Sequence, residues 1–347
     1  MTTHLTAVLR TFGFILLALF LCAAIFAAVG LSAGDTLRGV VEGAFFRPGA
    51  SDHILRWGLP LLITSVGVVI SFRAGYFNIG AQGQFYIGAI AAAFAAEALR
   101  GSPAWLAVPL CLIAGVIGGG LWALWPALLR VRAGADEVIT TMMGNFIAAL
   151  ALVHVTSGPL KDPSGSGQQA SSRPIEAAHR ISESSGTSPM IVALALATVA
   201  LGWWLTRRTA FGLLSGLAGR NPVMVAWQGA RVDRIAIGAF VLSGALAGLA
   251  GAVELLGPNG RLASGILPTH GFTAILIALV AGLSVLVTAL VALFFGALAS
   301  SALFLPVMTG LPAAAIEIIN ASIALFITAR TDGPRAAIRH WRTRWKT

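Results

Sequence analysis

The sequence predicts an all-α, polytopic membrane protein with about ten transmembrane helices. Hydrophobic residues make up 57% of the 347 residues and charged residues only 10%, whereas a soluble domain carries about a quarter charged residues. The mean hydropathy is +0.86, and ten apolar stretches approach the length that crosses a ~30 Å hydrocarbon core. A soluble protein of this size could not cover its surface with so little charge, so the composition argues against that alternative.

The ten spans are expected at 11–31, 54–72, 79–98, 105–128, 138–155, 190–205, 235–256, 272–283, 285–305 and 313–329. The apolar run of the first span is longer than the ~7–15 residues typical of a cleaved signal peptide. Cys22 follows Leu-Phe-Leu, without the small residue that a lipoprotein cleavage site needs. We therefore expect the first span to be retained as a membrane helix. The eighth span is the shortest.

The distribution of charge predicts the orientation. With a cytoplasmic N-terminus, 15 of the 23 basic residues fall in inner loops and the tail 330–347, and these inner segments carry a net charge of +11. Outer loops and span ends hold eight basic and eight acidic residues. Lys and Arg are enriched in cytoplasmic loops, so both termini are expected inside. The net charge of +10 therefore indicates membrane sorting rather than nucleic-acid binding.

The stretch RAGYFNIGAQGQFYIG, residues 73–88, places polar residues and four glycines between two apolar runs. Polar, irregular backbone at membrane depth is tolerated only where it is buried in protein or lines an aqueous cavity. The stretch is therefore the first candidate for a translocation path. Its glycines would also let helices pack closely or break into half-helices, as transporter helices do at binding sites.

Other polar residues inside the spans extend this candidate path. The full set comprises Asn78, Gln82, Gln84, Thr141, Asn145, Glu317 and Asn320. Such residues are costly in lipid and usually face the interior of the bundle. Their amides and hydroxyls could bind a sugar or the edge of a base, or they could form hydrogen bonds between helices. Glu317 could be protonated, or paired with Arg73 or with a backbone dipole; sequence leaves these alternatives open.

Two loops are long enough to have functions of their own. The external loop 158–189 is rich in Ser, Gly and Pro, which gives no reason to expect a compact domain. It is expected to be a partly mobile connector or a docking surface for an external partner. In the inner loop 207–234, Asn221 can cap a short helix over 223–227 that has Pro222 in its first turn and stops near Gly229. That helix would form a rigid cytoplasmic knob or lie in the lipid headgroups.

Four tracts resemble the permease subunits of bacterial ATP-binding-cassette (ABC) importers of the branched-chain amino acid, ribose and nucleoside class. They are RAGYFNIGAQGQF at 73–85, GADEVITTMMGNFIA at 134–148, FGLLSGLAGRNPVMVAWQGARV at 211–232 and GFTAILIALVAG at 271–282. The chain is most similar to permeases that work with binding proteins of the basic membrane protein family. The resemblance implies nucleoside import by alternating access in the bacterial inner membrane, with a simple sugar such as ribose as the alternative substrate.

The resemblance also implies partners. Inner-loop residues Gly219, Arg220, Asn221, Pro222 and Gly229 would contact a cytoplasmic ATPase subunit, which would carry ATP and Mg. A second, similar permease subunit and an external binding protein are expected as well. The loop departs from the family pattern, which usually has Ala-Ala after the proline and a basic residue before Gly-x-Asn-Pro; here Met224–Ala226 and Ser215–Leu217 stand at those places.

No catalytic or metal-binding pattern is present. The sequence lacks a GxxxxGK[ST] phosphate loop, and the six histidines have no metal-ligand spacing. We therefore expect a transport subunit, not an enzyme, with no cofactor of its own, formed by one permease domain over residues 1–347. Spans 2–5 and 7–10 are candidates for an inverted repeat. A secondary transporter is less favoured, because Glu317 alone hardly makes a charge relay.

Overall fold

The computed structural model describes residues 33–164, 170–181, 187–263, 265 and 267–302, together with Phe20 and Ser322. The expected spans 11–31 and 313–329, the tail 330–347, and Glu317 and Asn320 lie outside the described residues. The chain divides into two compact units, one of Met1–Ser51 with Ala297–Thr347 and one of Asp52–Gly296. That the whole chain forms one permease domain stays a prediction.

The first unit contains a short helix and a π-helix in its described part. Helix α2 is Ala33–Val41 and the π-helix η1 is Glu42–Phe46. The Nε atom of Arg38 lies 2.6 Å from Oε1 of Glu42, one turn further on. The last residues of α12 (Val285–Ala302) also belong to this unit.

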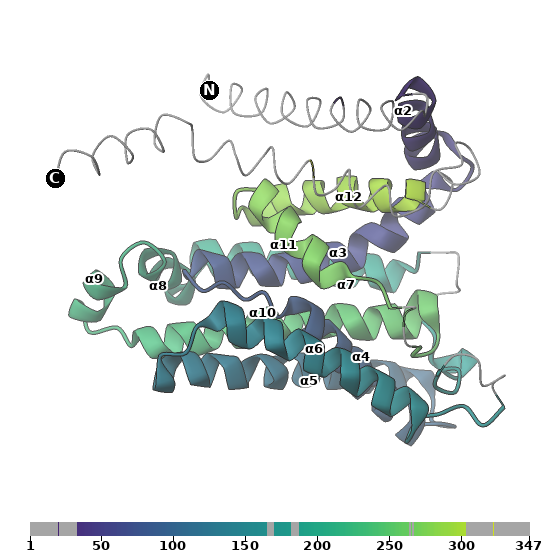
Figure 1. Ribbon diagram of the computed structural model, residues 1–347, viewed down its shortest axis with the longest axis horizontal. Helices are drawn as coiled ribbons and strands as arrows, with labels where there is room; N and C mark the ends of the chain where they lie inside the picture. The colour runs from purple at the N-terminus through teal and green to yellow at the C-terminus, as the bar shows by residue number, and fades with distance from the viewer. Residues whose placement is uncertain are drawn as a thin grey trace. The chain divides into compact units, whose positions relative to one another are not determined.

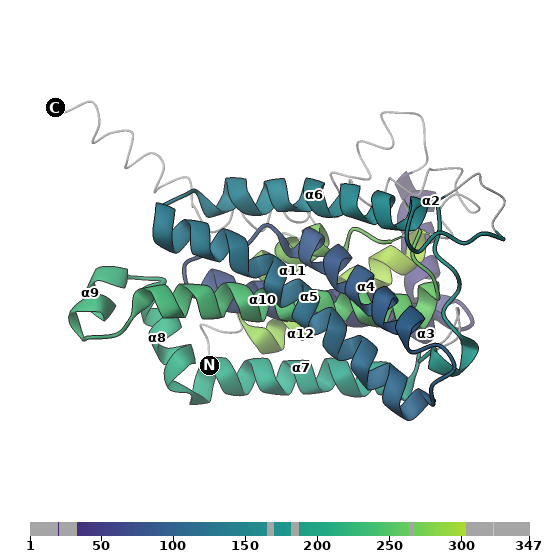
Figure 2. The same cartoon turned by 90° about the horizontal axis from the view of Figure 1, so that it is seen from below.

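The second unit is a bundle of helices (Figures 1 and 2). In chain order it contains α3 (Ala50–Arg73), α4 (Ala81–Ala98), α5 (Ala104–Ala133), α6 (Glu137–Ser157), η2 (Ala177–His179), α7 (Pro189–Arg208), α8 (Ala210–Ala218), α9 (Pro222–Trp227), α10 (Val232–Glu254), η3 (Leu255–Asn259), α11 (His270–Val280) and most of α12. Among the described residues, β-structure is limited to the isolated bridges Lys161–Ser172 and Ser171–Ala263.

Local sequence signals fix the helix ends. The α5–α6 turn is set by Gly134, which adopts a left-handed φ of 64°, and by Asp136, whose side chain accepts a hydrogen bond from Val138 N at 2.8 Å. Ser188 caps α7 in the same way, with Pro189 in the first turn. Because caps satisfy backbone groups that a helix end leaves free, they stabilise these boundaries.

Helices α4, α5 and α10 pack backbone against backbone. A Cβ atom added at Gly88 of α4 would collide with the Cα atom of Gly248 of α10, and one added at Gly119 of α5 would collide with the carbonyl oxygen of Gly244. Small residues allow this close approach, which stabilises helix association in membranes by dispersion. The three helices thus form the centre of the second unit.

Six described helices are long and apolar enough to cross a membrane: α3, α5, α6, α7, the combined α10 and η3, and α12. Helix α4 has 18 residues, but Gln82 and Gln84 make its first turn polar. Helix α11 has 11 residues and ends at Val280, three residues before the end of the expected span 272–283. The all-α polytopic fold class is confirmed, whereas the number of ten spans stays a prediction.

Candidate functional site

The stretch between α3 and α4 is an irregular, partly buried turn. Gly75 adopts a left-handed φ of 83°, which side-chain-bearing residues rarely accept. Asn78 follows three residues later with a fully buried side chain. Protein therefore encloses the stretch at Ala74, Asn78 and Gly80, whereas Gly75 and Phe77 are exposed.

Asn78 and Gln84 bind each other through both of their amide groups. Asn78 Nδ2 donates to Gln84 Oε1 at 2.9 Å, and Gln84 Nε2 donates to Asn78 Oδ1 at 3.0 Å. Asn78 Nδ2 also donates to Ser243 Oγ of α10 at 3.0 Å, while Asn78 Oδ1 accepts from Gly80 N at 3.0 Å. This polar cluster therefore joins the irregular turn to α4 and α10.

Gln82 and Asn145 extend the cluster to two further helices. Gln82 Oε1 accepts from Gly271 N of α11 at 2.7 Å, and its Nε2 donates to Pro268 O at 3.1 Å. Asn145 of α6 accepts from Gly83 N at 2.7 Å and donates to Ile79 O at 3.0 Å. The start of α4 is thus bonded to α6 on one side and α11 on another.

Five of the seven predicted path residues are therefore close to the first turn of α4. Thr141 lies one turn before Asn145 on the same buried face of α6, and its hydroxyl donates to Glu137 O at 2.6 Å. Thr141 and Gln84 border a small recess, also lined by Gly80, Trp122, Trp125, Pro126 and Gly144. The amides of Asn78, Gln82, Gln84 and Asn145 are hydrogen-bonded to other groups of this chain, as expected for hydrogen bonding between helices. Their contact with substrate stays a prediction.

The inner loop contains the expected short helix. Asn221 Oδ1 accepts a hydrogen bond from Met224 N at 3.0 Å, and Pro222 occupies the first turn of α9. Gly229 follows the helix with a left-handed φ of 80°. One side of α9 is anchored, since Val225 is fully buried, whereas Trp227 is 89% exposed. The capping prediction is confirmed, and α8 with α9 forms an arm whose outer side is free within the described structure.

A buried ion pair lies elsewhere in the second unit. Arg56 Nη2 is 2.8 Å from Glu254 Oε1, and the Glu254 side chain has no exposed surface. His270 Nε2 lies 3.8 Å from Glu254 Oε2, and the Arg56 guanidinium stacks 4.3 Å from the centroid of the Trp57 ring. The charge count misses this pair, because it treats Glu254 only as one of the charges at outer span ends. A sequence signal for the pair is that Arg56 and Glu254 both interrupt apolar stretches near the predicted outer ends of their spans.

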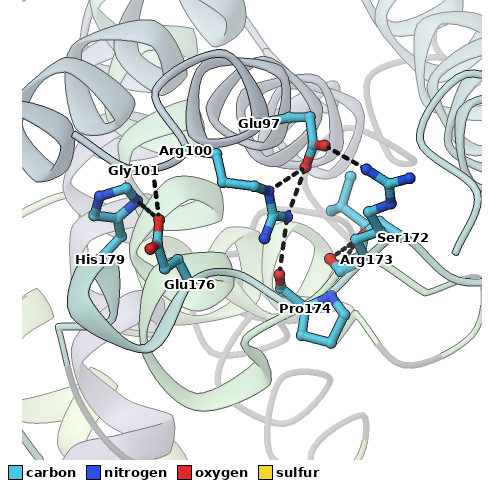
Figure 3. Close-up of polar contacts among 9 residues, drawn as sticks. Glu97, Arg100, Gly101, Ser172, Arg173, Pro174, Glu176 and His179 are labelled. Carbon is cyan, nitrogen blue, oxygen red and sulfur yellow. Dashed lines mark hydrogen bonds and ion pairs between the residues drawn. The ribbon is translucent and has the colours of Figure 1, made fainter.

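The described parts of the external loop are anchored to the bundle (Figure 3). Glu97 at the end of α4 pairs with Arg100 at 2.7 Å and with Arg173 of the loop at 3.1 Å. Glu176 accepts from Gly101 N at 2.9 Å, and the ring of buried His179 is hydrogen-bonded to Ser102 O at 2.8 Å. These contacts tie the described part of the loop to the end of α4 and the residues after it, and its role as connector or docking surface stays a prediction.

In the part of the chain that the structure describes, no group of three His, Cys, Asp or Glu side chains could hold a metal ion. Cys111 is free and buried, as is common for a cysteine that packs as a small apolar side chain. Apolar helices joined by a buried amide cluster, with an inner-loop arm, define a polytopic membrane protein of the transport class.

Comparison with known proteins specifies the family. The chain belongs to the family described as permease components of branched-chain amino acid transport systems, whose model matches residues 51–327. Relatives in this family are transport subunits. The confirmed family agrees with the resemblance carried by the four sequence tracts.

Individual relatives cover most of the chain. It is 31% identical to the guanosine ABC transporter permease protein NupP of Bacillus subtilis, over 91% of each chain. It is 29% identical to the glucose ABC transporter permease protein TsgB13 of Haloferax volcanii, over 80% of this chain and 76% of that one. It is also 29% identical to the nucleoside ABC transporter permease protein NupB of Lactococcus lactis, over 78% and 77%. The two bacteria each have a second similar permease, NupQ and NupC.

Proposed function

We propose that this chain is the transmembrane permease subunit of an ABC importer for nucleosides. The observation that carries the proposal is the similarity to a guanosine permease along 91% of both chains. A second nucleoside permease among the relatives supports the same substrate class. A simple sugar is the alternative, because a glucose permease is nearly as similar.

In the proposed mechanism, an external binding protein delivers the substrate and the path opens alternately to either side of the membrane. The substrate path would include Asn78, Gln82, Gln84, Thr141, Asn145, Glu317 and Asn320. Amides and hydroxyls suit this substrate, since they can donate to and accept from ribose hydroxyls and base edges. In the described state the amides of α4 and α6 bind protein, so substrate would have to replace some of these hydrogen bonds.

The arm formed by α8 and α9 is the proposed contact with the ATPase subunit, which would hold ATP and Mg. Its outer side presents Val223 and Trp227, which are 61% and 89% exposed. Exposed Arg220, Arg231 and Arg234 flank these apolar side chains. A complementary partner surface would be an apolar cleft with an acidic rim. Gly219, Asn221, Pro222 and Gly229 would shape the arm.

The remaining partners and the location complete the proposal. The pairs NupP with NupQ and NupB with NupC support assembly with a second, similar permease subunit. The complex would lie in the bacterial inner membrane with both termini of this chain in the cytoplasm. The loop 158–189 would then face outward, and the tail 330–347 would face the cytoplasm.

Uptake by the reconstituted complex tests the function. The chain would be co-expressed with its ATPase, second permease and binding protein and placed in proteoliposomes. We expect ATP-dependent uptake of labelled guanosine, competed by other nucleosides and not by glucose or ribose. Competition by a sugar alone would favour the sugar importer, and uptake without ATP or the ATPase would contradict an ABC mechanism.

The double substitution Asn221→Ala and Pro222→Gly tests the arm. It removes the α9 cap and frees its first turn, and loss of such a cap costs about 0.5–2 kcal/mol. We expect uptake per ATP hydrolysed to fall while membrane insertion stays normal. The matched control is Ser188→Ala, which removes the cap of α7 instead. Wild-type uptake by the double variant would contradict the coupling role.

A further inference from the structure

The α8–α9 arm touches the irregular turn through bare backbone. A Cβ atom at Gly219 would collide with the carbonyl oxygen of Arg73 and lie 2.9 Å from Gly75 N. In the opposite direction, a Cβ atom at Gly75 would lie 2.8 Å from Gly219 Cα. The end of α8 and the start of the turn therefore meet with no side chain between them.

A buried apolar cluster holds this contact in place. Its buried members are Ala74, Ala218, Val225, Ile235 and Ala239. Tyr76 packs against the cluster, and its ring centroid lies 5.9 Å from that of Phe240 in α10. Burial raises the pKa of the Tyr76 phenol, which keeps the ring neutral. Because close-packed interiors transmit strain, displacement of α9 would be passed directly to Ala74.

The chain leads from this contact to the amide cluster. Asn78 is three residues after Gly75, a distance of at most about 11 Å along the chain. From there the hydrogen bonds of Asn78 reach Ser243 of α10, and those of Gln82 reach Gly271 of α11. A short segment thus connects the cytoplasmic arm with both helices.

We propose that residues 74–84 transmit arm movement to the amide cluster and that Gly219 is the positioning residue of this link. The inference rests on the proposed function and assigns Gly219 an internal contact instead of an ATPase contact. Movement of α9 shifts the backbone of Arg73 to Gly75, and this shift changes the geometry in which Asn78 and Gln82 bind α10 and α11. The coupling of hydrolysis to transport then depends on the absence of a side chain at position 219.

Gly219→Ala tests the link, with Gly216→Ala as the matched control. Both add one methyl group at or beside α8, but a Cβ atom at Gly216 meets only Arg73 Nη2, at an ordinary 3.7 Å. The measurement is the ratio of nucleoside taken up to ATP hydrolysed by the complete complex in proteoliposomes. Overpacking a close contact costs about 1–3 kcal/mol, and 1 kcal/mol corresponds to a factor of about five. We therefore expect Gly219→Ala to lower the ratio by about fivefold or more. Gly216→Ala should keep the wild-type ratio.

The outcomes separate this inference from the proposed function. A wild-type ratio in Gly219→Ala, or an equal loss in both variants, would overturn the link. If Gly219→Ala does not assemble, Val225→Ala decides instead, because it loosens the same cluster without adding atoms. A lowered ratio in Val225→Ala supports the link, and an unchanged ratio overturns it. Absence of ATP-dependent uptake in the wild-type complex would contradict the proposed function itself.

Discussion

Gln82 shows most clearly how one side chain can combine structural and transport roles. Its amide joins α4 to the first turn of α11 through Gly271 N and Pro268 O. Gln82 is 2% exposed; its bond to Gly271 N is buried, and its bond to Pro268 O is partly buried. A substrate that competes for this amide would weaken the contact between α4 and α11.

Replacing Gln82 with Leu should affect both stability and uptake. Leucine leaves the buried Gly271 N without its partner, and an unsatisfied buried group costs about 1–3 kcal/mol. The partly buried Pro268 O loses its partner as well. We expect a lower melting temperature of the complex in detergent and slower uptake per assembled complex. Thr140→Val is the control, because the Thr140 hydroxyl binds only carbonyls of its own helix turn.

The two measurements divide the possible roles of Gln82. Lower stability with wild-type uptake per complex would assign it to helix packing alone. Slower uptake at wild-type stability would assign it to the substrate path alone.

Sequence identifies these residues but not their partners. The Asn221 cap is predictable because donor and acceptor lie three residues apart. The bonds of Asn78 to Ser243, Gln82 to Gly271 and Arg56 to Glu254 join residues 165, 189 and 198 positions apart. Hydropathy does not specify which residues of distant helices face each other. The partners in the amide cluster and in the buried ion pair are therefore seen only in the three-dimensional structure.

At the scale of elements, glycines determine how the helices pack. Gly248 of α10 is the central position, because a Cβ atom there would collide with the carbonyl oxygen of Gly115 and lie 2.9 Å from the Cα atom of Gly119. Both partners belong to α5. Neither helix can yield without moving its backbone.

Gly248→Ala should therefore destabilise the protein. Overpacking a close contact costs about 1–3 kcal/mol. Gly120→Ala, one residue beyond the α5 contact, is the matched control, because its Cβ atom would meet nothing closer than 3.6 Å. Thermal unfolding in detergent should show a lower midpoint for the first variant and little change for the second. Equal midpoints would contradict the backbone contact.

Helix boundaries follow from sequence where polar residues mark them. The expected spans 79–98 and 138–155 agree closely with α4 (Ala81–Ala98) and α6 (Glu137–Ser157). The span 272–283 extends too far because Gly282 and Leu283 both adopt left-handed φ angles, 60° and 57°. Because leucine is apolar, Leu283 extends the predicted span, and nothing in the local sequence indicates the left-handed turn at this leucine.

At the scale of the whole molecule, the orientation rests on the bias of basic residues. That bias predicts the arm inside and the loop 158–189 outside. Ser164 and Gln228, both exposed, represent these two regions. They are therefore suitable positions for measuring accessibility from either side of the membrane.

Single cysteines at Ser164 and Gln228 should report opposite sides. They would be introduced after Cys22→Ser and Cys111→Ser. In right-side-out vesicles, a membrane-impermeant maleimide should label Ser164→Cys, whereas Gln228→Cys should react only after permeabilisation. The reverse pattern would overturn the orientation, and with it the location of the arm on the ATPase side.

The close glycine contacts have a consequence for motion. At their closest points helices α4, α5 and α10 meet backbone to backbone, so movement of one past another at those points would require the backbones to separate first. The turn at 74–80 and the left-handed pair Gly282–Leu283 are connections outside these contacts. Arg73 Nη1 lies 3.5 Å from Leu283 O, so the residue that precedes the first connection lies beside the second.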